Sequence, residues 1–543
     1  MKFKFLFSLL LGAGALSAFA QGGYQDGIDY YNADRFEDAQ EILNKTLNEP
    51  STDKALSYFY LGSIDLRDGK TASAKEFFNK GVSANPDCAY NYVGLGQIAL
   101  AAGDKKTAQD EFKQALKLGG KDAKVMAAVA RAYYNVDPVT YAKEIDSNIK
   151  NAMKASKNLE SAVYVLQGDM VTNDPGKAAG LYEQAITYDQ DKGIVNPEAY
   201  VKYANVYIKV NPKFAIDKLI ELNNQLPTSA LAQRELAEKY YDNNQFTRAA
   251  EQYGKYMANP NHFQRDEQRY SGLLYFGKDY EKSLQVANQV LAADPNNPYM
   301  QRMVMLNQYE LGNLPAAIAA GQKLFGTPGA EFTANDYTTY GDALYDSKDY
   351  QGALDAYQNA LKVNPEKWNI YSKVSSAYTG LEQYGPAAEA QQMFVDNGGD
   401  DVTLTDLFVL SNRYKNLAVS SEEGSAARKE AATKGLVYID KAIADAAEAS
   451  RPSLLRNRAT LLMLRDGDTT PEVVDTYNQM IAIYDKDPES KTKNADAYKA
   501  AYGSIAGFYR AQGDMGKALE YYQLLLSVDP DNEALRDYIK SIK

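Results

Sequence analysis

The chain has 543 residues, in which 71 acidic side chains outnumber 59 basic ones, so its net charge is −12. An acidic surface repels phosphate backbones and anionic lipids, and we therefore expect no nucleic acid among its partners. The single cysteine and the single histidine exclude an internal disulfide framework and leave too few ligands for a zinc site of His and Cys.

Residues 1–20 are predicted to be a signal peptide. They combine two lysines, an apolar run from Phe5 to Leu16 and an Ala-x-Ala-like end before Gln21. The run is too short to favour a membrane anchor, no cysteine follows the cleavage position as in a lipoprotein, and no later run approaches spanning length. Cleavage would leave 57 basic and 71 acidic residues, a net charge of −14. We expect a periplasmic mature chain without membrane insertion, with secretion as the alternative.

Residues 340–365 predict two amphipathic helices joined by a short turn. In YGDALYDSKDYQGALDAYQNALKVNP, apolar residues recur every three or four positions on both sides of the polar DSKD. The Asn-Pro pair at the end stops the second helix. Gly341 and Ala353 fall where the two helices would cross, so a larger side chain at either position would force the helices apart.

This arrangement recurs elsewhere in the chain. With Ala334 as position 1, the fixed positions are Gly341 at 8, Ala353 at 20, Tyr357 at 24 and Pro365 at 32. Segments that begin at Ala55 and Lys499 follow the same 34-residue template. The template resembles the tetratricopeptide repeat, in which small residues occupy the helix crossing and aromatic residues the interface. The resemblance implies an all-α fold, a right-handed solenoid of helix-turn-helix units.

The template can be followed along the whole chain and predicts about fourteen units. A truncated unit over residues 24–50 comes first. The later units are predicted to start near Ala55, Ala89, Ala123, Ser161, Pro197, Ala230, Gln264, Pro298, Ala334, Trp368, Leu404, Pro452 and Lys499. No segment predicts a strand, because the tyrosine-rich stretches also have a period of three to four.

Residues 21–543 are therefore predicted to form a single solenoid. A soft boundary could fall near 396–403, at the sequence DNGGDD, although repeats continue on both sides of it. The residues at 415–435 are predicted to be a helical insertion, since they are rich in Ala, Glu and Lys. Residues 532–543 are predicted to form the polar capping helix that a solenoid needs at its end.

No catalytic, cofactor or metal site is predicted. His262 lies between units without a second histidine, and Cys88 at a unit junction is more readily interpreted as a packing residue than as a reactive thiol. The acidic loops lack the residue order of a calcium loop, and the glycines fall at helix crossings rather than in a phosphate loop. We therefore expect a protein that is not an enzyme and binds no cofactor.

A partner groove is predicted on the first helices of the units. The resemblance implies that positions 2, 5, 6, 9, 12 and 13 of each unit face the concave side. Position 12 is tyrosine in four consecutive units, at Tyr241, Tyr275, Tyr309 and Tyr345. Arginines at neighbouring positions are Arg234, Arg265, Arg269 and Arg302. Tyr and Arg are enriched in binding hot spots, although the same tyrosines could equally pack against adjoining helices.

The function indicated by this pattern is that of a protein-protein interaction scaffold. Exported proteins of this kind often accompany transport, secretion or assembly complexes of the bacterial envelope, which is an implication of the resemblance. A chaperone or carrier for exported polypeptides is the alternative, and an enzyme such as a glycan hydrolase is a remote one. The oligomeric state and the identity of the protein or peptide partner do not follow from the sequence.

Overall fold

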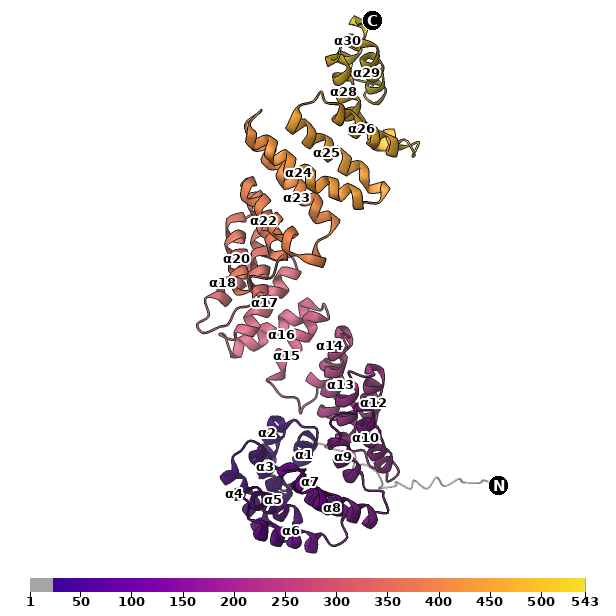
Figure 1. Cartoon of the computed structure of the whole chain (residues 1–543). Helices are drawn as coiled ribbons and strands as arrows, with labels where there is room; N and C mark the ends of the chain where they lie inside the picture. Colours follow the sequence, from indigo (N-terminus) through magenta and orange to yellow (C-terminus); the bar gives the residue numbers. More distant parts are fainter. Residues whose placement is uncertain (1–22, 543) are drawn as a thin grey trace, which may run out of the picture. The chain divides into compact units, whose positions relative to one another are not determined.

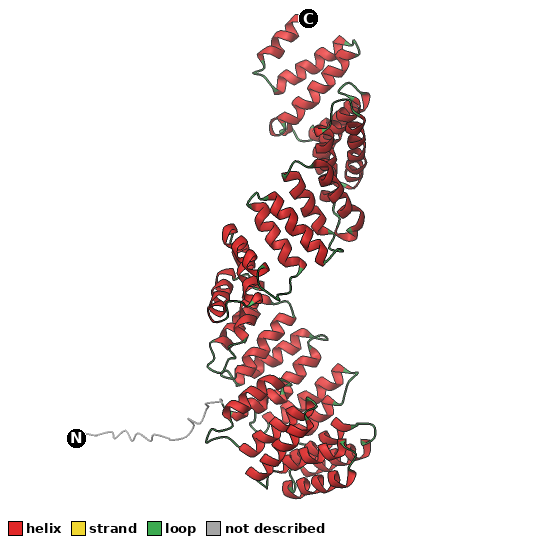
Figure 2. Cartoon of the chain, turned by 90° about the vertical axis from the view of Figure 1, so that its left-hand side faces the viewer, coloured by secondary structure: helices red, strands yellow, loops and turns green. Residues whose placement is uncertain are grey.

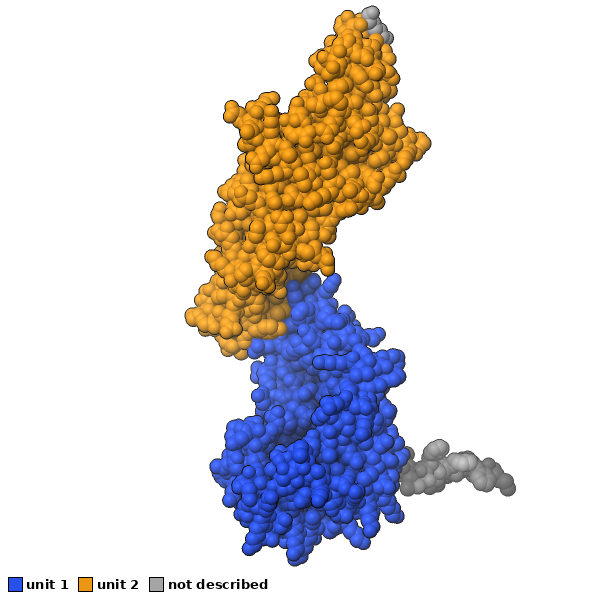
Figure 3. Space-filling view, in the orientation of Figure 1, with its two compact units in different colours: residues 1–290 blue, residues 291–543 orange. Residues whose placement is uncertain are grey.

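The computed structural model describes residues 23–542, and these residues form helices and loops without any strand (Figure 2). The all-α prediction is thus confirmed. The predicted signal peptide, residues 1–20, lies outside the described residues. The chain divides into two compact units, residues 1–290 and residues 291–543, which we describe separately as unit 1 and unit 2 (Figure 3).

The described part of unit 1, from residue 23 on, contains fifteen complete helices and most of a sixteenth (Figure 1). They are α1 (Tyr24–Asn32), α2 (Phe36–Thr46), α3 (Lys54–Arg67), α4 (Thr71–Ala84), α5 (Ala89–Ala101), α6 (Lys105–Gly119), α7 (Ala123–Val136), α8 (Ala142–Ala155), α9 (Ser161–Asp169), α10 (Pro175–Gln190), α11 (Pro197–Tyr207), α12 (Pro212–Gln225), α13 (Ala230–Asp242), α14 (Phe246–Met257), α15 (Asp266–Phe276) and α16 (Tyr280–Ala293).

Unit 2 continues the same alternation of helices. They are α17 (Pro298–Glu310), α18 (Leu314–Phe325), α19 (Ala334–Asp346), α20 (Tyr350–Val363), α21 (Asn369–Gly380), α22 (Tyr384–Asn397), η1 (Gly399–Asp401), α23 (Leu404–Ser420), α24 (Ala426–Asp445), η2 (Glu448–Ser450), α25 (Arg451–Asp466), α26 (Pro471–Tyr484), α27 (Ser490–Lys493), α28 (Ala495–Ala511), α29 (Met515–Val528) and α30 (Glu533–Ser541).

The helices pair as the template predicts. Among the described residues, α1 to α26 form thirteen consecutive pairs, and α28 with α29 makes the fourteenth. Several first helices begin at the predicted residue itself, as at Ala123, Ser161 and Ala230, because a polar residue before each of them caps the helix. Asp122, for example, accepts a hydrogen bond from the backbone N–H of Lys124 at 2.8 Å. The prediction of about fourteen helix-turn-helix units is confirmed.

The helix crossings explain the fixed small residues. A Cβ atom added to Gly341 would lie 2.6 Å from Cε1 of Tyr357, the aromatic residue at position 24 of the same unit. Gly62 has the same relation to Phe78, also at 2.6 Å. Real Cβ atoms do not approach other atoms so closely, so these positions accept only glycine unless the helices separate. The packing role predicted for Gly341 follows from this contact.

The irregular segments have simple structural consequences. The predicted insertion at 415–435 lengthens α23 and α24 to 17 and 20 residues, instead of the 12 to 14 of α19 to α22. Residues 396–403 lie within unit 2 and include the short helix η1. A helix, α30, occupies the segment predicted to cap the chain, and it buries Ile539. The single-solenoid assignment of residues 21–543 stays a prediction.

Candidate functional site

The four tyrosines of the predicted groove all lie near the ends of first helices and are half-buried. Tyr241 and Tyr275 belong to unit 1, and Tyr309 and Tyr345 belong to unit 2. The tyrosines of each unit are therefore described as a separate pair. Whether these rings form a partner surface stays a prediction.

Three of the tyrosine rings contact an aromatic residue five positions later, at the first position of the second helix. The ring centroids are 5.5 Å apart for Tyr241 and Phe246, 5.5 Å for Tyr275 and Tyr280, and 5.3 Å for Tyr345 and Tyr350. Such pairs contribute about 0.5–1.5 kcal/mol beyond their buried area. These three tyrosines thus pack across the turn between the two helices of their own unit. They have this packing role although they are partly exposed.

The predicted groove arginines all have carboxylate partners within the chain. Arg234 binds Asp38 and Asp266, Arg265 binds Asp38 and Glu41, Arg269 binds Glu238, and Arg302 binds Asp336. A partner carboxylate would have to share these guanidinium groups with the existing acids. The arginines therefore offer fewer unoccupied donors than the sequence suggests, because their partners lie on other helices and cannot be recognised from spacing.

One part of the predicted groove exposes apolar surface. Phe276, at the end of α15, is 46% exposed, and its ring centroid lies 6.0 Å from that of Tyr241 and 5.5 Å from that of Phe246. The guanidinium carbon of Arg269 lies 4.1 Å from the centre of the Tyr241 ring. We call Tyr241, Phe246, Tyr275 and Phe276 the aromatic patch. It lies entirely in unit 1.

Unit 1 also brings together helices that are far apart in the sequence. Helix α1 contacts α11 and α13 in addition to its neighbours. Arg35, which follows α1, donates two hydrogen bonds to the Glu235 carboxylate on α13, at 2.7 and 2.8 Å. Lys202 on α11 donates to Asp34 at 3.0 Å. The first helix pair is thereby attached to residues about 170 to 200 positions later, so unit 1 closes on itself.

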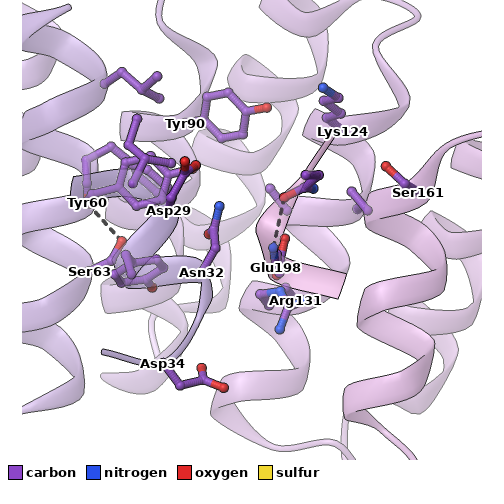
Figure 4. Close-up of a pocket in the computed structure, with 18 of the residues that line it drawn as sticks. Asp29, Asn32, Asp34, Tyr60, Ser63, Tyr90, Lys124, Arg131, Ser161 and Glu198 are labelled. Atoms are coloured by element: carbon purple, nitrogen blue, oxygen red, sulfur yellow. Dashed lines mark hydrogen bonds between the residues drawn. The ribbon is translucent and has the colours of Figure 1, made fainter. Parts of the chain in front are cut away.

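The closure encloses a cavity of about 1000 Å³, which we call the unit 1 cavity. Most of its lining residues come from first helices and the residues that flank them. The helices that contribute most of the lining residues are α1, α3, α5, α7, α9 and α11, and α2 and α10 add Phe36 and Asp189. Figure 4 shows the polar side chains of Asp29, Arg131 and Glu198 around this space, together with the rings of Tyr60 and Tyr90.

The two deep cations of the cavity are neutralised by neighbouring acids. Arg131 on α7 binds the Asp169 carboxylate at 2.6 Å, and Lys202 lies 3.3 Å from Asp169 and 3.0 Å from Asp34. Burial alone would raise the pKa of Asp169, but the charges of Arg131 and Lys202 hold it below its ordinary value. This cluster is therefore balanced internally, with two cations for two carboxylates.

Four further carboxyl groups that line the cavity have no cation at ion-pair distance among the described residues, namely Asp29, Glu160, Asp189 and Glu198. Two of them, Asp29 and Glu198, have a strongly raised pKa. Asp29 is only 8% exposed and accepts one hydrogen bond, from the Gln25 amide at 3.0 Å. Burial, with smaller contributions from the charges of Asp26 and Glu198, raises the pKa of Asp29 to about 7. Burial also raises the pKa of Glu198 to about 7, although Lys202 and Arg131 partly oppose the shift. Both acids therefore keep their protons to a higher pH than an ordinary aspartic or glutamic acid does.

The family models match this chain in three segments. A model described as TPR repeat matches residues 341–380, and one described as Tetratricopeptide repeat matches residues 55–88 and 500–532. The chain carries tetratricopeptide (TPR) repeats. Repeats of this type indicate a protein-protein interaction scaffold, in agreement with the sequence analysis. No curated protein matches the chain.

Solved structures of similar TPR proteins include three from different sources. The C-terminal part of a TPR repeat-containing protein from Cytophaga hutchinsonii is 19% identical, covers 50% of this chain and 98% of its own, and has a TM-score of 0.40. Yeast Tom70 is 13% identical over 92% of this chain and 98% of its own, with a TM-score of 0.31. The APC/C hetero-tetramer Cut9-Hcn1 is 14% identical over 95% of both chains, with a TM-score of 0.28.

Some residues of the aromatic patch and of the unit 1 cavity could have been found from the TPR template alone. Glu198 occupies position 2 of the unit that begins at Pro197, one of the positions expected to face the groove. The spacing of Tyr241 and Phe246 repeats in two other units and could have identified the aromatic pairs. Nothing in the sequence indicates that Asp29 lies near Glu198, because 169 positions separate these residues and only the closure of unit 1 brings them together.

The two other residues considered in the sequence analysis, His262 and Cys88, lie at the junctions between helix-turn-helix units. His262 donates from Nδ1 to the backbone carbonyl of Asn259 at 2.6 Å, and burial raises the pKa of the half-buried Cys88 thiol. Residues 23–542 contain no group of three or more His, Cys, Asp or Glu side chains suited to a metal ion. Within the same residues, no helix combines the length and the apolar character needed to span a bilayer.

Proposed function

We propose that this TPR protein is a non-enzymatic scaffold of the bacterial periplasm that binds a peptide or a domain of a partner protein within an envelope transport, secretion or assembly complex. The TPR repeats support the binding role. The lysine-containing, apolar first 20 residues support export.

The observation that carries the proposal is the aromatic patch. Phe276 keeps 46% of its surface exposed although it lies among three other aromatic residues on inward-facing helix ends. Exposed aromatic surface next to an arginine is the composition of interface hot spots, because it offers large apolar area with few rotors to immobilise. We propose that an apolar side chain of the partner packs on Phe276.

Site-specific photo-crosslinking in the native host tests this proposal. A benzophenone amino acid replaces Phe276 in one variant and Phe214 in the other. Phe214 is a matched control, since it is also a phenylalanine of unit 1 and is 49% exposed, but it lies on the second helix α12. We expect one stoichiometric partner that crosslinks from position 276 and does not crosslink from position 214.

Two other outcomes would contradict the proposal that the protein is a scaffold whose partner binds the aromatic patch. A heterogeneous set of weakly bound exported polypeptides from position 276 would instead indicate a chaperone or carrier. The same partner from both positions would show that the aromatic patch is not the binding surface. Fractionation and N-terminal sequencing of the mature protein test the location, with Gln21 expected as the first residue.

A further inference from the structure

We propose that the unit 1 cavity is a binding site for an alkylammonium or guanidinium cation that is attached to an apolar or flat group, as in a lysine or arginine side chain of a short peptide segment. This site is separate from the aromatic patch. It goes beyond the scaffold proposal, and either proposal can fail without the other.

The first argument is the balance of charge inside the cavity. Arg131 and Lys202 are matched by Asp169 and Asp34, which leaves four lining acids without an ion pair among the described residues, namely Asp29, Glu160, Asp189 and Glu198. One lining cation, the exposed Lys124, also has no ion pair there, so the acids remain in excess. Asp29 is more than nine-tenths buried, and the side-chain donor it meets among residues 23–542 is the neutral amide of Gln25. A buried carboxylate without a cation is costly, and an entering ammonium or guanidinium would remove this cost.

The second argument is the aromatic wall beside these acids. The rings of Tyr31 and Tyr60 are 4.9 Å apart, Phe59 lies 5.1 Å from Tyr60, and Tyr90 lies 5.4 Å from Phe59. All four residues line the cavity. Glu198 lines the same cavity as these rings, and its charge adds to burial in raising the pKa of the Tyr31 and Tyr60 phenols. Carboxylates combined with aromatic faces are the surroundings that organic cations prefer.

The size of the cavity favours more than a single small ion. A volume of about 1000 Å³ is at the upper end of the range for ligand pockets and holds a charged side chain with its neighbours in a peptide. The rim cation Arg67 is already engaged, since its guanidinium carbon lies 4.0 Å from the centre of the Phe36 ring. Among the described residues, an anionic ligand would therefore meet one lining cation without an ion pair, Lys124, and four such acids.

Calorimetric titration of the full mature chain provides the test. The probe is the peptide acetyl-Ala-Phe-Arg-Ala-amide, and its matched control replaces Arg by citrulline, which has the same shape and no charge. At pH 8 we expect the citrulline peptide to bind at least 30-fold more weakly. Agmatine, a free guanidinium compound, distinguishes the two sources of the cation: binding as tight as that of the peptide shows a small-molecule site, and much weaker binding shows a peptide site.

The pH dependence and two variants connect binding to the acids. The charged groups that face them are Asp26 around Asp29, and Lys202, Arg131, Asp169 and Asp34 around Glu198. Because the cation requires both carboxyl groups in their ionised form, we expect affinity to fall at least tenfold from pH 8 to pH 6, with release of protons on binding. We also expect Glu198→Gln and Asp29→Asn to weaken binding at least tenfold each. Asp191→Asn, at an exposed residue outside the cavity, should leave binding unchanged.

Three results would overturn the proposal. The first is equal affinity for the Arg and citrulline peptides, and the second is absence of binding for both up to millimolar concentration. The third is preferential binding of inorganic phosphate to the wild-type chain with no effect of Glu198→Gln. The peptide pair needs no mutation, so the test does not depend on whether the variants fold.

Discussion

The two units are built from the same helix pairs but are held together differently. In unit 2, ion pairs join neighbouring repeats, as in Arg302 with Asp336 and Lys373 with Asp342, which are 34 and 31 positions apart. Unit 1 adds contacts between residues about 200 positions apart, such as Arg35 with Glu235. Stability in a solenoid is approximately a sum of nearest-neighbour terms, and we expect unit 2 to follow this rule and unit 1 to depart from it.

The largest effect is expected from filling a helix crossing. In Gly341→Leu the new side chain would collide with the Tyr357 ring, and we expect a loss of about 3 kcal/mol in the free energy of unfolding of unit 2. Hydrogen exchange should speed up only in α19, α20 and adjacent helices. The matched variant Gly62→Leu should loosen a larger part of unit 1, including α11 and α13. Uniform loosening over all of unit 2 would contradict the nearest-neighbour behaviour.

The next effect is of similar size and compares two buried carboxylates that each bind an arginine, although Asp336 also accepts a hydrogen bond from the backbone N–H of Thr333 at 2.7 Å. Glu235 is 1% exposed and accepts two hydrogen bonds from Arg35, and Asp336 is 1% exposed and accepts two from Arg302. Removing one member of such a buried pair costs about 3–5 kcal/mol. We expect Glu235→Gln to accelerate hydrogen exchange in α1 and α2 as well as in α13.

The control is Asp336→Asn, which should accelerate hydrogen exchange only in α17, α19 and their neighbours. If the two substitutions perturb equally local regions, unit 1 is not closed by the Arg35 contact. The comparison does not require a partner or ligand.

A smaller effect concerns pH. The folded protein keeps the Asp29 proton to about pH 7, whereas an unfolded aspartate releases it at about pH 4. The folded state therefore binds more protons in this interval, and the free energy of unfolding decreases as the pH rises through it. The variant Asp29→Asn has no proton to release there, so its free energy of unfolding lacks this decrease. The difference in free energy of unfolding, variant minus wild type, should therefore rise by about 2–4 kcal/mol from pH 4 to pH 8. Denaturant titrations of both proteins at these two pH values measure the gain, and a constant difference would contradict the raised pKa.

The smallest effect on stability is expected at the predicted groove. The rings of Tyr275 and Tyr309 are half-buried, and truncating both to alanine should weaken partner binding by about 2 kcal/mol if they are hot-spot residues. The melting temperature should then change little. A strongly lowered melting temperature with unchanged affinity would assign these rings to packing alone, as the contact of Tyr275 with Tyr280 also suggests.

The sequence predicted what is local and repeated. Helix pairs, their starts and the glycines at the crossings follow from spacing within 34 residues, as Gly341 and Tyr357 illustrate. The partners of the arginines and the position of Asp29 did not follow, since they depend on how far successive pairs rotate. A small rotation per pair, summed over six pairs, decides whether α1 meets α11, and no single residue specifies that sum.

The closure of unit 1 is the central claim, because the cavity and its uncompensated acids depend on it. Zero-length carbodiimide crosslinking of the purified chain, followed by mass spectrometry, tests it directly, since this reagent joins only lysines and acids that touch. We expect an amide between Lys202 and Asp34, whose Nζ and Oδ2 atoms are 3.0 Å apart, formed within one molecule in a mixture of ¹⁴N- and ¹⁵N-labelled chains. Lys373 and Asp342 should crosslink as the neighbour control. Crosslinks between neighbouring repeats alone, with Asp34 unlinked to Lys202, would contradict the closed unit.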